Sequence, residues 1–323
     1  DYKVTGVQTC ALPISASNWS LNDGGTASGA IPSTTDDAYF TSNSGNCTVN
    51  TATRVCANLI FSGVGAGDYS GTFTLNNTLT AAGNVTLSAT MTTGGTSTLT
   101  VTGARTLTSN GKTWVPNLSL PSTAVTYTFV GNWTNSGNFS AGTSNGNTTL
   151  SAAVATNIDL AGNLTVTNTG GRVIGSNITI RMNGSGAQTW SHPSYTGNGT
   201  LDVNLNISNA SVSVSGSVGY GGASNSVLTV SANITTTGST IFLQSAATLD
   251  TSACTWNNVT SVPNGPTYTL NSNLNIGGAF AINATTAGQT LNMGNNNINL
   301  GGNLTINTSS GNTTQNVGTG AIV

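Results

Sequence analysis

The chain carries very little charge. Only 4% of its 323 residues are charged, glutamate is absent, and six lysines and arginines stand beside eight aspartates and one histidine. An average soluble domain carries about 25% charged residues. Six basic residues are too few for the basic stripe of a nucleic-acid-binding surface. Acid–base catalysis has only scattered aspartates and one histidine available. We therefore expect no nucleic-acid partner, no enzymatic activity, no metal and no cofactor.

Residues that favour helices are scarce as well, since glutamate is absent and only two lysines occur. No apolar run approaches the roughly 20 residues that cross a bilayer, so we expect no membrane span in this chain. The four cysteines show no CxxC or Cys/His spacing typical of zinc sites. What remains is glycine, asparagine, serine and threonine around 36% apolar residues. That apolar share disfavours disorder, because it can bury a core.

Short segments with strict apolar/polar alternation dominate the sequence. Thr98–Val101, Leu164–Val166 and Leu304–Asn307 are examples, with Leu, Val or Ile alternating with Thr or Asn. This period of two is typical of a half-buried strand. Glycine and asparagine separate these segments, and both residues tolerate the positive φ of tight corners. The pattern predicts an all-β protein.

The strands recur in four imperfect copies, which we place at the alternating segments beginning at Thr72, Thr126, Thr200 and Thr267. Such self-similarity predicts a parallel β-helix or β-solenoid with roughly 20 residues per coil. Apolar ladders would then point inward and threonine and asparagine ladders outward. The low charge fits, because like charges stacked in register repel. The alternative is a row of tandem β-sandwich domains.

Three regions differ in composition. Residues 1–14 (DYKVTGVQTCALPI) lack asparagine and serine and resemble a translated sequencing adapter, which implies a chain read from an environmental assembly. Such a segment is left out of fold reasoning. We expect residues 15–50 to cap the solenoid, because an open first coil invites strand pairing. Residues 51–323 would form the repeats, and we expect the chain to be truncated at its C-terminus.

Two small groups of residues are candidates for chemistry. Cys47 and Cys56 lie nine positions apart and predict a local disulfide in an oxidising compartment; the alternative is two buried free thiols. Trp190, His192 and Tyr195 form a candidate sugar-contact patch, and the alternative is a loop in which Pro193 ends a strand.

The aspartates offer weaker signals. Asp36 and Asp37 are the only adjacent acids and suggest either a calcium ligand pair or a solvated turn, of which we expect the turn. Asp159, Asp202 and Asp250 are scattered, so sequence spacing does not join them into an acidic site.

Several segments have a composition typical of one broad group of proteins, namely Asn18–Ser20, Asp36–Phe40, Thr48–Val49 and Gly83–Leu87. They resemble secreted repetitive β-strand proteins, such as adhesin-like and autotransporter-passenger β-solenoids. The resemblance implies a non-enzymatic structural or adhesin-like protein at a bacterial cell surface, with glycans or other surfaces as partners. Alternatives are a phage tail-fibre or spike segment and a carbohydrate-active β-helix enzyme. Irregular threonine spacing disfavours an ice-binding lattice. The oligomeric state stays open.

Overall fold

The computed structural model describes residues 3–6, 19, 31–50, 53–63, 67–122, 124–142, 146–168, 170–193, 195, 199–222, 226–244, 246–261, 267–283, 289–307, 313–316 and 320–323. These residues divide into two compact units. Unit 1 comprises residues 1–140 and 150–160, and unit 2 comprises residues 141–149 and 161–323. Strands and connecting turns make up the described part of both units, with no helix among those residues.

Unit 1 is a solenoid of parallel strands. Its first sheet holds β4 (Arg54–Cys56), β7 (Leu79–Ala81), β10 (Thr98–Val101) and β13 (Asn117–Leu120). A second contains β1 (Lys3–Gly6), β2 (Asp37–Phe40), β5 (Leu59–Ile60), β8 (Val85–Thr86), β11 (Arg105–Thr108) and β14 (Val125–Val130). The remaining pairings join β3 (Cys47–Val49), β6 (Thr72–Leu75) and β9 (Thr92–Gly95), and separately β12 (Thr113–Trp114), β15 (Trp133–Asn135) and β17 (Thr148–Leu160).

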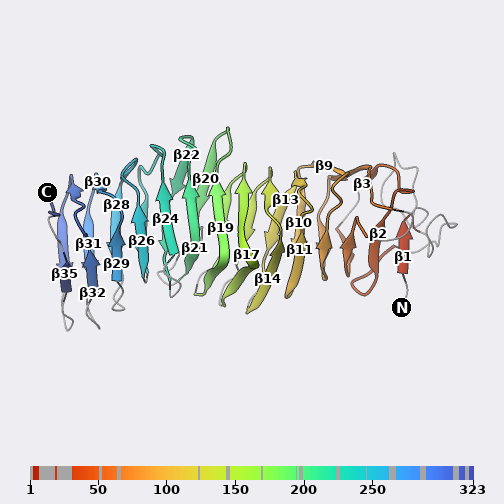
Figure 1. Cartoon of the computed structure of the whole chain (residues 1–323), viewed down its shortest axis with the longest axis horizontal. Coiled ribbons are helices and arrows are strands. Elements are labelled where there is room, and N and C mark those ends of the chain that lie inside the picture. The colour runs from red at the N-terminus through yellow and green to blue at the C-terminus, as the bar shows by residue number, and fades with distance from the viewer. Residues whose placement is uncertain are drawn as a thin grey trace. The chain divides into compact units, whose positions relative to one another are not determined.

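Unit 2 repeats this arrangement (Figure 1). One set holds β18 (Leu164–Val166), β20 (Gln188–Ser191) and β22 (Val212–Ser215), and another β27 (Thr255–Trp256), β30 (Leu274–Ile276) and β33 (Ile298–Leu300). A third contains β23 (Ser217–Tyr220), β25 (Thr240–Leu243), β28 (Asn258–Ser261), β31 (Phe280–Asn283) and β34 (Leu304–Asn307). A fourth contains β24 (Ser226–Val230), β26 (Ala247–Asp250), β29 (Thr267–Leu270), β32 (Gln289–Asn292) and β35 (Thr313–Asn316). The remaining strands of unit 2 are β19 (Arg172–Met182) and β21 (Thr200–Ile207), and β16 (Phe139–Ala141) spans the boundary between the units in sequence.

The register of the strands confirms the β-solenoid. Ile241 pairs with Val259, 18 positions later, and Val259 pairs with Phe280, 21 positions later. Phe280 in turn pairs with Leu304, 24 positions later. Apolar residues therefore stack on apolar residues from coil to coil, with a coil length that varies around the expected value. The β-sandwich alternative is wrong, because sandwiches are built from antiparallel sheets and these strands pair in parallel.

The four long copies expected from the sequence are not equivalent elements. Thr72 lies in β6, which pairs with β3 and β9. Thr126 lies in β14, which pairs with β11 in a different sheet. The true repeat is the single coil. Alternating segments from different sides of a coil look alike in sequence, because each has one apolar and one polar face.

The side chains predicted to point inward do so. Leu164, Val166, Ile178 and Ile180 are at most 2% exposed. Four tryptophans, Trp114, Trp133, Trp190 and Trp256, are also almost completely buried. Tyr127, Tyr220 and Tyr268 each donate from the hydroxyl group to a backbone carbonyl of a preceding coil, Tyr127 to the Val101 oxygen at 2.8 Å. The ring stays in the apolar interior while the polar tip is satisfied.

The N-terminal segments take part in the stacking. Strand β1 lies within the segment that resembles an adapter, and it pairs in parallel with β2; the other residues of that segment lie outside the described ones. Its valine and threonine favour extended backbone. Within residues 15–50, β2 and β3 pair with β5 and β6 in the same way as later coils. Trp19 packs edge-on against Phe40 at 5.6 Å between ring centroids.

Candidate functional site

The candidate aromatic patch is divided between the inside and the outside of the coil. Trp190 is completely buried and packs edge-on against Tyr220, with ring centroids 6.1 Å apart. His192 is 3% exposed and its Nε2 contacts the Asn168 carbonyl. Only Tyr195 is partly exposed. The expected sugar-contact patch of Trp190, His192 and Tyr195 therefore does not exist as a surface, because Trp190 alternates inward on β20.

Tyr195 lies across the outer side of a sheet. Its ring packs on Phe242 at 4.8 Å between centroids, and the Gln244 side-chain amide donates to its hydroxyl. Gly219 makes this placement possible, because a Cβ there would lie 2.6 Å from Tyr195 Cε2 and 2.2 Å from the Gly199 oxygen. Tyr195 thus packs against the outer side of the sheet.

Burial lowers the pKa of His192 below its ordinary value of 6.5, against a smaller opposite effect of the hydrogen bond to the Asn168 carbonyl. The neutral ring donates from Nε2, and Nδ1 is buried with no hydrogen-bond partner in the described part of the chain. A second proton would place a charged N–H there. Tyr195, the titratable group against the ring, stays neutral, because burial raises its pKa.

We expect the protein to lose stability as the pH falls below 6.5. The unfolded state then binds a proton that folded His192 resists, so the free energy of unfolding is highest above 6.5 and declines toward the lower folded pKa. Urea titrations from about pH 8 to about pH 5 measure this decline. His192→Gln keeps a donor for the Asn168 carbonyl without titrating and should flatten it. An equal slope in both proteins would contradict the assignment, since His192 is the only histidine.

The disulfide expected between Cys47 and Cys56 is not formed. Both residues are free and buried. Cys47 stacks on Phe73 and Cys56 on Ala81, so the two thiols point into the coil from different sheets. Burial, and to a smaller extent the negative charge of Asp37, raise the pKa of Cys56 to about 12. Such a thiol is a small apolar core residue, because the reactive thiolate is suppressed.

The aspartates singled out in the sequence have separate environments. Asp36 accepts hydrogen bonds from the Ser33 hydroxyl group and from the Ser33 backbone N–H. Both lower the pKa of Asp36, and the hydroxyl group has the larger effect. This is the solvated turn expected there. Asp250 pairs with Thr229, and Asp202 with Ile174, so the register does not join these two acids. Among the described residues, no group of three or more His, Cys, Asp or Glu side chains is placed to hold a metal ion.

No protein-family model, curated protein or solved structure matches the chain. No helix in the described residues is long and apolar enough to cross a membrane.

One recurrent group of residues was not recognised from the sequence. At coil corners, an asparagine Oδ1 accepts the backbone N–H of a residue 21 to 26 positions later, at 2.6–3.0 Å. We call these residues the corner asparagines. In unit 1 they are Asn46, Asn58, Asn84, Asn117 and Asn132. In unit 2 they are Asn147, Asn163, Asn204, Asn258, Asn273 and Asn297.

Hydroxyl and amide side chains cover the outer faces of the strands. In unit 1, Thr80 stacks on Thr100 and Thr100 on Ser119. In unit 2, Asn299 donates from Nδ2 to Asn275 Oδ1 at 2.7 Å, and Asn307 does the same to Asn283. Such rows present donors and acceptors at the spacing of the coils, about 4.8 Å.

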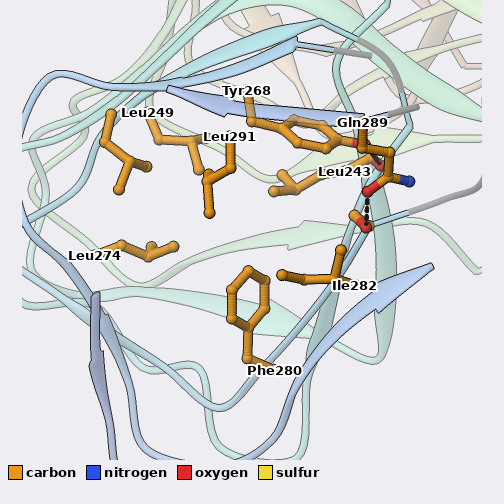
Figure 2. A pocket seen from close by; sticks show the side chains of 10 residues that line it. Leu243, Leu249, Tyr268, Leu274, Phe280, Ile282, Gln289 and Leu291 are labelled. Carbon is orange, nitrogen blue, oxygen red and sulfur yellow. Dashed lines mark hydrogen bonds between the residues drawn. The ribbon is translucent and has the colours of Figure 1, made fainter. Parts of the chain in front are cut away.

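The apolar core of unit 2 contains one small gap among its described residues. A cavity of about 10 Å³ lies among leucines and Phe280, Tyr268 and Ile282 in unit 2 (Figure 2). At its edge Ser261 donates from its hydroxyl to Gln289 Oε1 at 2.8 Å. This volume is at the limit for a single water molecule. This cavity is a gap in core packing and is too small for a ligand.

Proposed function

We propose that the chain is a non-enzymatic, extracellular structural or adhesin-like β-solenoid that contacts glycans or other surfaces at a bacterial cell. The observation that carries the proposal is the stacking of outward hydroxyl and amide groups in rows. Thr80, Thr100 and Ser119 form one such row. Each group both donates and accepts hydrogen bonds, which suits the hydroxyl groups of a polysaccharide. A single contact of this kind is weak, and regular repetition adds many of them.

The low charge supports the same proposal. With six basic and eight acidic residues in 323, attraction between opposite charges contributes little to such contacts. Binding through neutral hydrogen bonds should therefore respond weakly to salt, whereas contacts between exposed charges are screened within about 10 Å at 0.1 M ionic strength.

We expect the full chain to be retained on at least one insoluble bacterial or plant polysaccharide, with retention unchanged by added salt. Co-sedimentation with a panel of such polysaccharides measures this. Replacing Thr80 and Thr100 together by valine keeps the β-branched shape and removes the hydroxyl groups. If that row is in the contact, retention falls several-fold, at about 1 kcal/mol for each hydrogen bond lost.

The matched control replaces the same two threonines by serine, which keeps the hydroxyl groups, and retention should then stay near the original. Loss of binding at moderate salt, or no retention on any polysaccharide, would contradict the proposal. A trimer in light scattering would instead favour the tail-spike alternative.

A further inference from the structure

Strand β19 is interrupted where it passes β21. The two strands are in register from Arg172 to Ile174 and again from Thr179 to Met182. Four residues of β19 lie between these stretches, opposite the single residue Val203 of β21. Asn177, in the middle of this bulge, has a left-handed φ of 57°. The backbone therefore leaves the sheet locally and returns to it, and bulges of this kind redirect side chains at functional surfaces.

The bulge borders a polar cavity of about 190 Å³. Its lining residues are Gly175, Asn177, Ile178, Asp202, Asn204 and Ser226. An engineered cavity of about 150 Å³ holds a benzene molecule, so this space is large enough for one side of a sugar ring. Unlike the gap in the core, it is lined by a carboxylate, two amides and a hydroxyl group.

A buried carboxylate lies at this cavity. The side chain of Asp202 is 0% exposed, and its Oδ2 lies 3.7 Å from Nη1 of Arg172, which is 33% exposed. Gly222 packs directly against the carboxylate, because a Cβ there would lie 1.9 Å from Oδ2. A carboxyl group with no exposed area therefore lines this polar space and supplies it with hydrogen-bond acceptors.

The other lining groups supply donors as well as acceptors. The Ser226 hydroxyl is buried, lies close to the Tyr220 hydroxyl, and is a further polar group at the cavity. Asn204 Oδ1 accepts the Val227 N–H at 3.0 Å. The NH₂ group of the same amide is the part of Asn204 that can donate to a ligand. A metal ion would meet oxygen ligands here, but it would also face the Arg172 guanidinium. A hydroxyl group uses both kinds of partner, donating to the carboxylate and accepting from an amide, hydroxyl or guanidinium.

We propose that this cavity binds one ring of a neutral sugar, with Asp202 accepting from ring hydroxyl groups and Asn177, Asn204 and Ser226 completing the contacts. The inference rests on the glycan contact proposed above and assigns it a specific site. The outward rows would provide weak general contact, and the cavity would choose among sugars, because a site built to bond a hydroxyl group rejects an analogue that lacks it.

The test uses the full chain, labelled with ¹⁵N, and a panel of neutral methyl glycosides of glucose, galactose, mannose and N-acetylglucosamine. At least one should shift the amide signal of Val227 in a saturable way, with a Kd in the range of about 1–10 mM. Asn177→Gly removes one lining amide at a backbone position that glycine readily adopts. Ser226→Ala removes the buried hydroxyl group. Each variant should weaken binding about tenfold.

Asn110→Gly is the matched control, since Asn110 also has a left-handed φ, of 48°, and lies in unit 1; it should leave the affinity unchanged. Three results would overturn the site: no glycoside shifts Val227, both variants bind as well as the original, or calcium shifts that signal while no sugar does. Polysaccharide retention by the Asn177→Gly protein separates the two proposals. Retention that persists when the glycoside titrations fail leaves the surface function standing and removes the cavity. Saturable glycoside binding without polysaccharide retention leaves the cavity site standing and removes the surface function.

Discussion

Replacing Phe61 by alanine is expected to lower the free energy of unfolding of unit 1 by about 3–5 kcal/mol. Phe61 is completely buried. Its ring stacks on Phe40 at 4.8 Å between centroids and meets Phe73 edge-on at 4.9 Å and Tyr69 at 5.5 Å. The substitution removes these aromatic contacts together and leaves a cavity that flat, hydrogen-bonded coils cannot collapse to fill. Urea titration followed by circular dichroism measures the loss.

The loss should also be local. Coils of a solenoid contact only their neighbours, so stability is a sum of nearest-neighbour terms. Amide hydrogen exchange should therefore accelerate around Phe61 and Phe73, while Ile158, at the far end of the unit's register from β5, keeps its protection. Thr74→Ala, an outward change on a neighbouring strand, is the control and should cost no more than about 1 kcal/mol. Equal loss of protection along the whole unit would show that the coils unfold as one block and would contradict the local picture.

The strands and their inward faces could be predicted from the sequence because both are local properties. The alternation in Thr98–Val101 fixes which side chains share a face, and β10 has those bounds with Leu99 and Val101 buried. Stacking of the strands in register was predictable too. Like charges in neighbouring coils would repel, and the sequence has few charges and many threonines and asparagines, which can stack in rows. These inferences need no knowledge of which coil lies beside which.

The surroundings of the candidate site residues, in contrast, depend on which coils lie side by side. Trp190 was a candidate ligand contact because it lies near His192 and Tyr195 in sequence, yet it alternates inward at β20 and contacts Tyr220 instead. Cys47 and Cys56 are close along the chain but belong to different sheets, which keeps their thiols apart. Burial at these positions is set by neighbouring coils, so spacing along the chain could not decide it.

The cavity beside Asp202 shows the same limit. In the sequence, Asp202 is one of several scattered acids. Its environment arises from a bulge between Ile174 and Thr179 and from Gly222, which lies on another coil. A bulge leaves no clear pattern when the interrupted strand remains alternating on either side of it. The corner asparagines are different, because a recurring asparagine immediately before an alternating segment is visible once its partner is known.

Replacing the corner asparagine Asn84 by alanine is expected to cost about 1 kcal/mol, because the Thr106 N–H exchanges its asparagine acceptor for water. Asn84 Oδ1 accepts that N–H at 2.9 Å, and the Asn84 N–H in turn donates to Asn58 Oδ1 at 2.6 Å. Asn58 donates from its own side chain to Asp37 Oδ1 at 2.6 Å. The three side chains therefore form a continuous series down one corner.

Asn84→Asp is the matched variant, since a carboxylate oxygen accepts the same N–H, and it should retain most of the stability at neutral pH. Its stability should then fall as the new carboxyl is protonated, because hydrogen bonding to the charged form lowers the folded pKa below the unfolded value of about 3.9. Urea titrations at neutral and acidic pH measure both effects. Equal losses for alanine and aspartate at neutral pH would mean that the corner is held by shape alone. The expected difference would instead make this N–H the reason that asparagine recurs at these positions, because a backbone donor at or near the start of a strand is satisfied by the asparagine of the coil before.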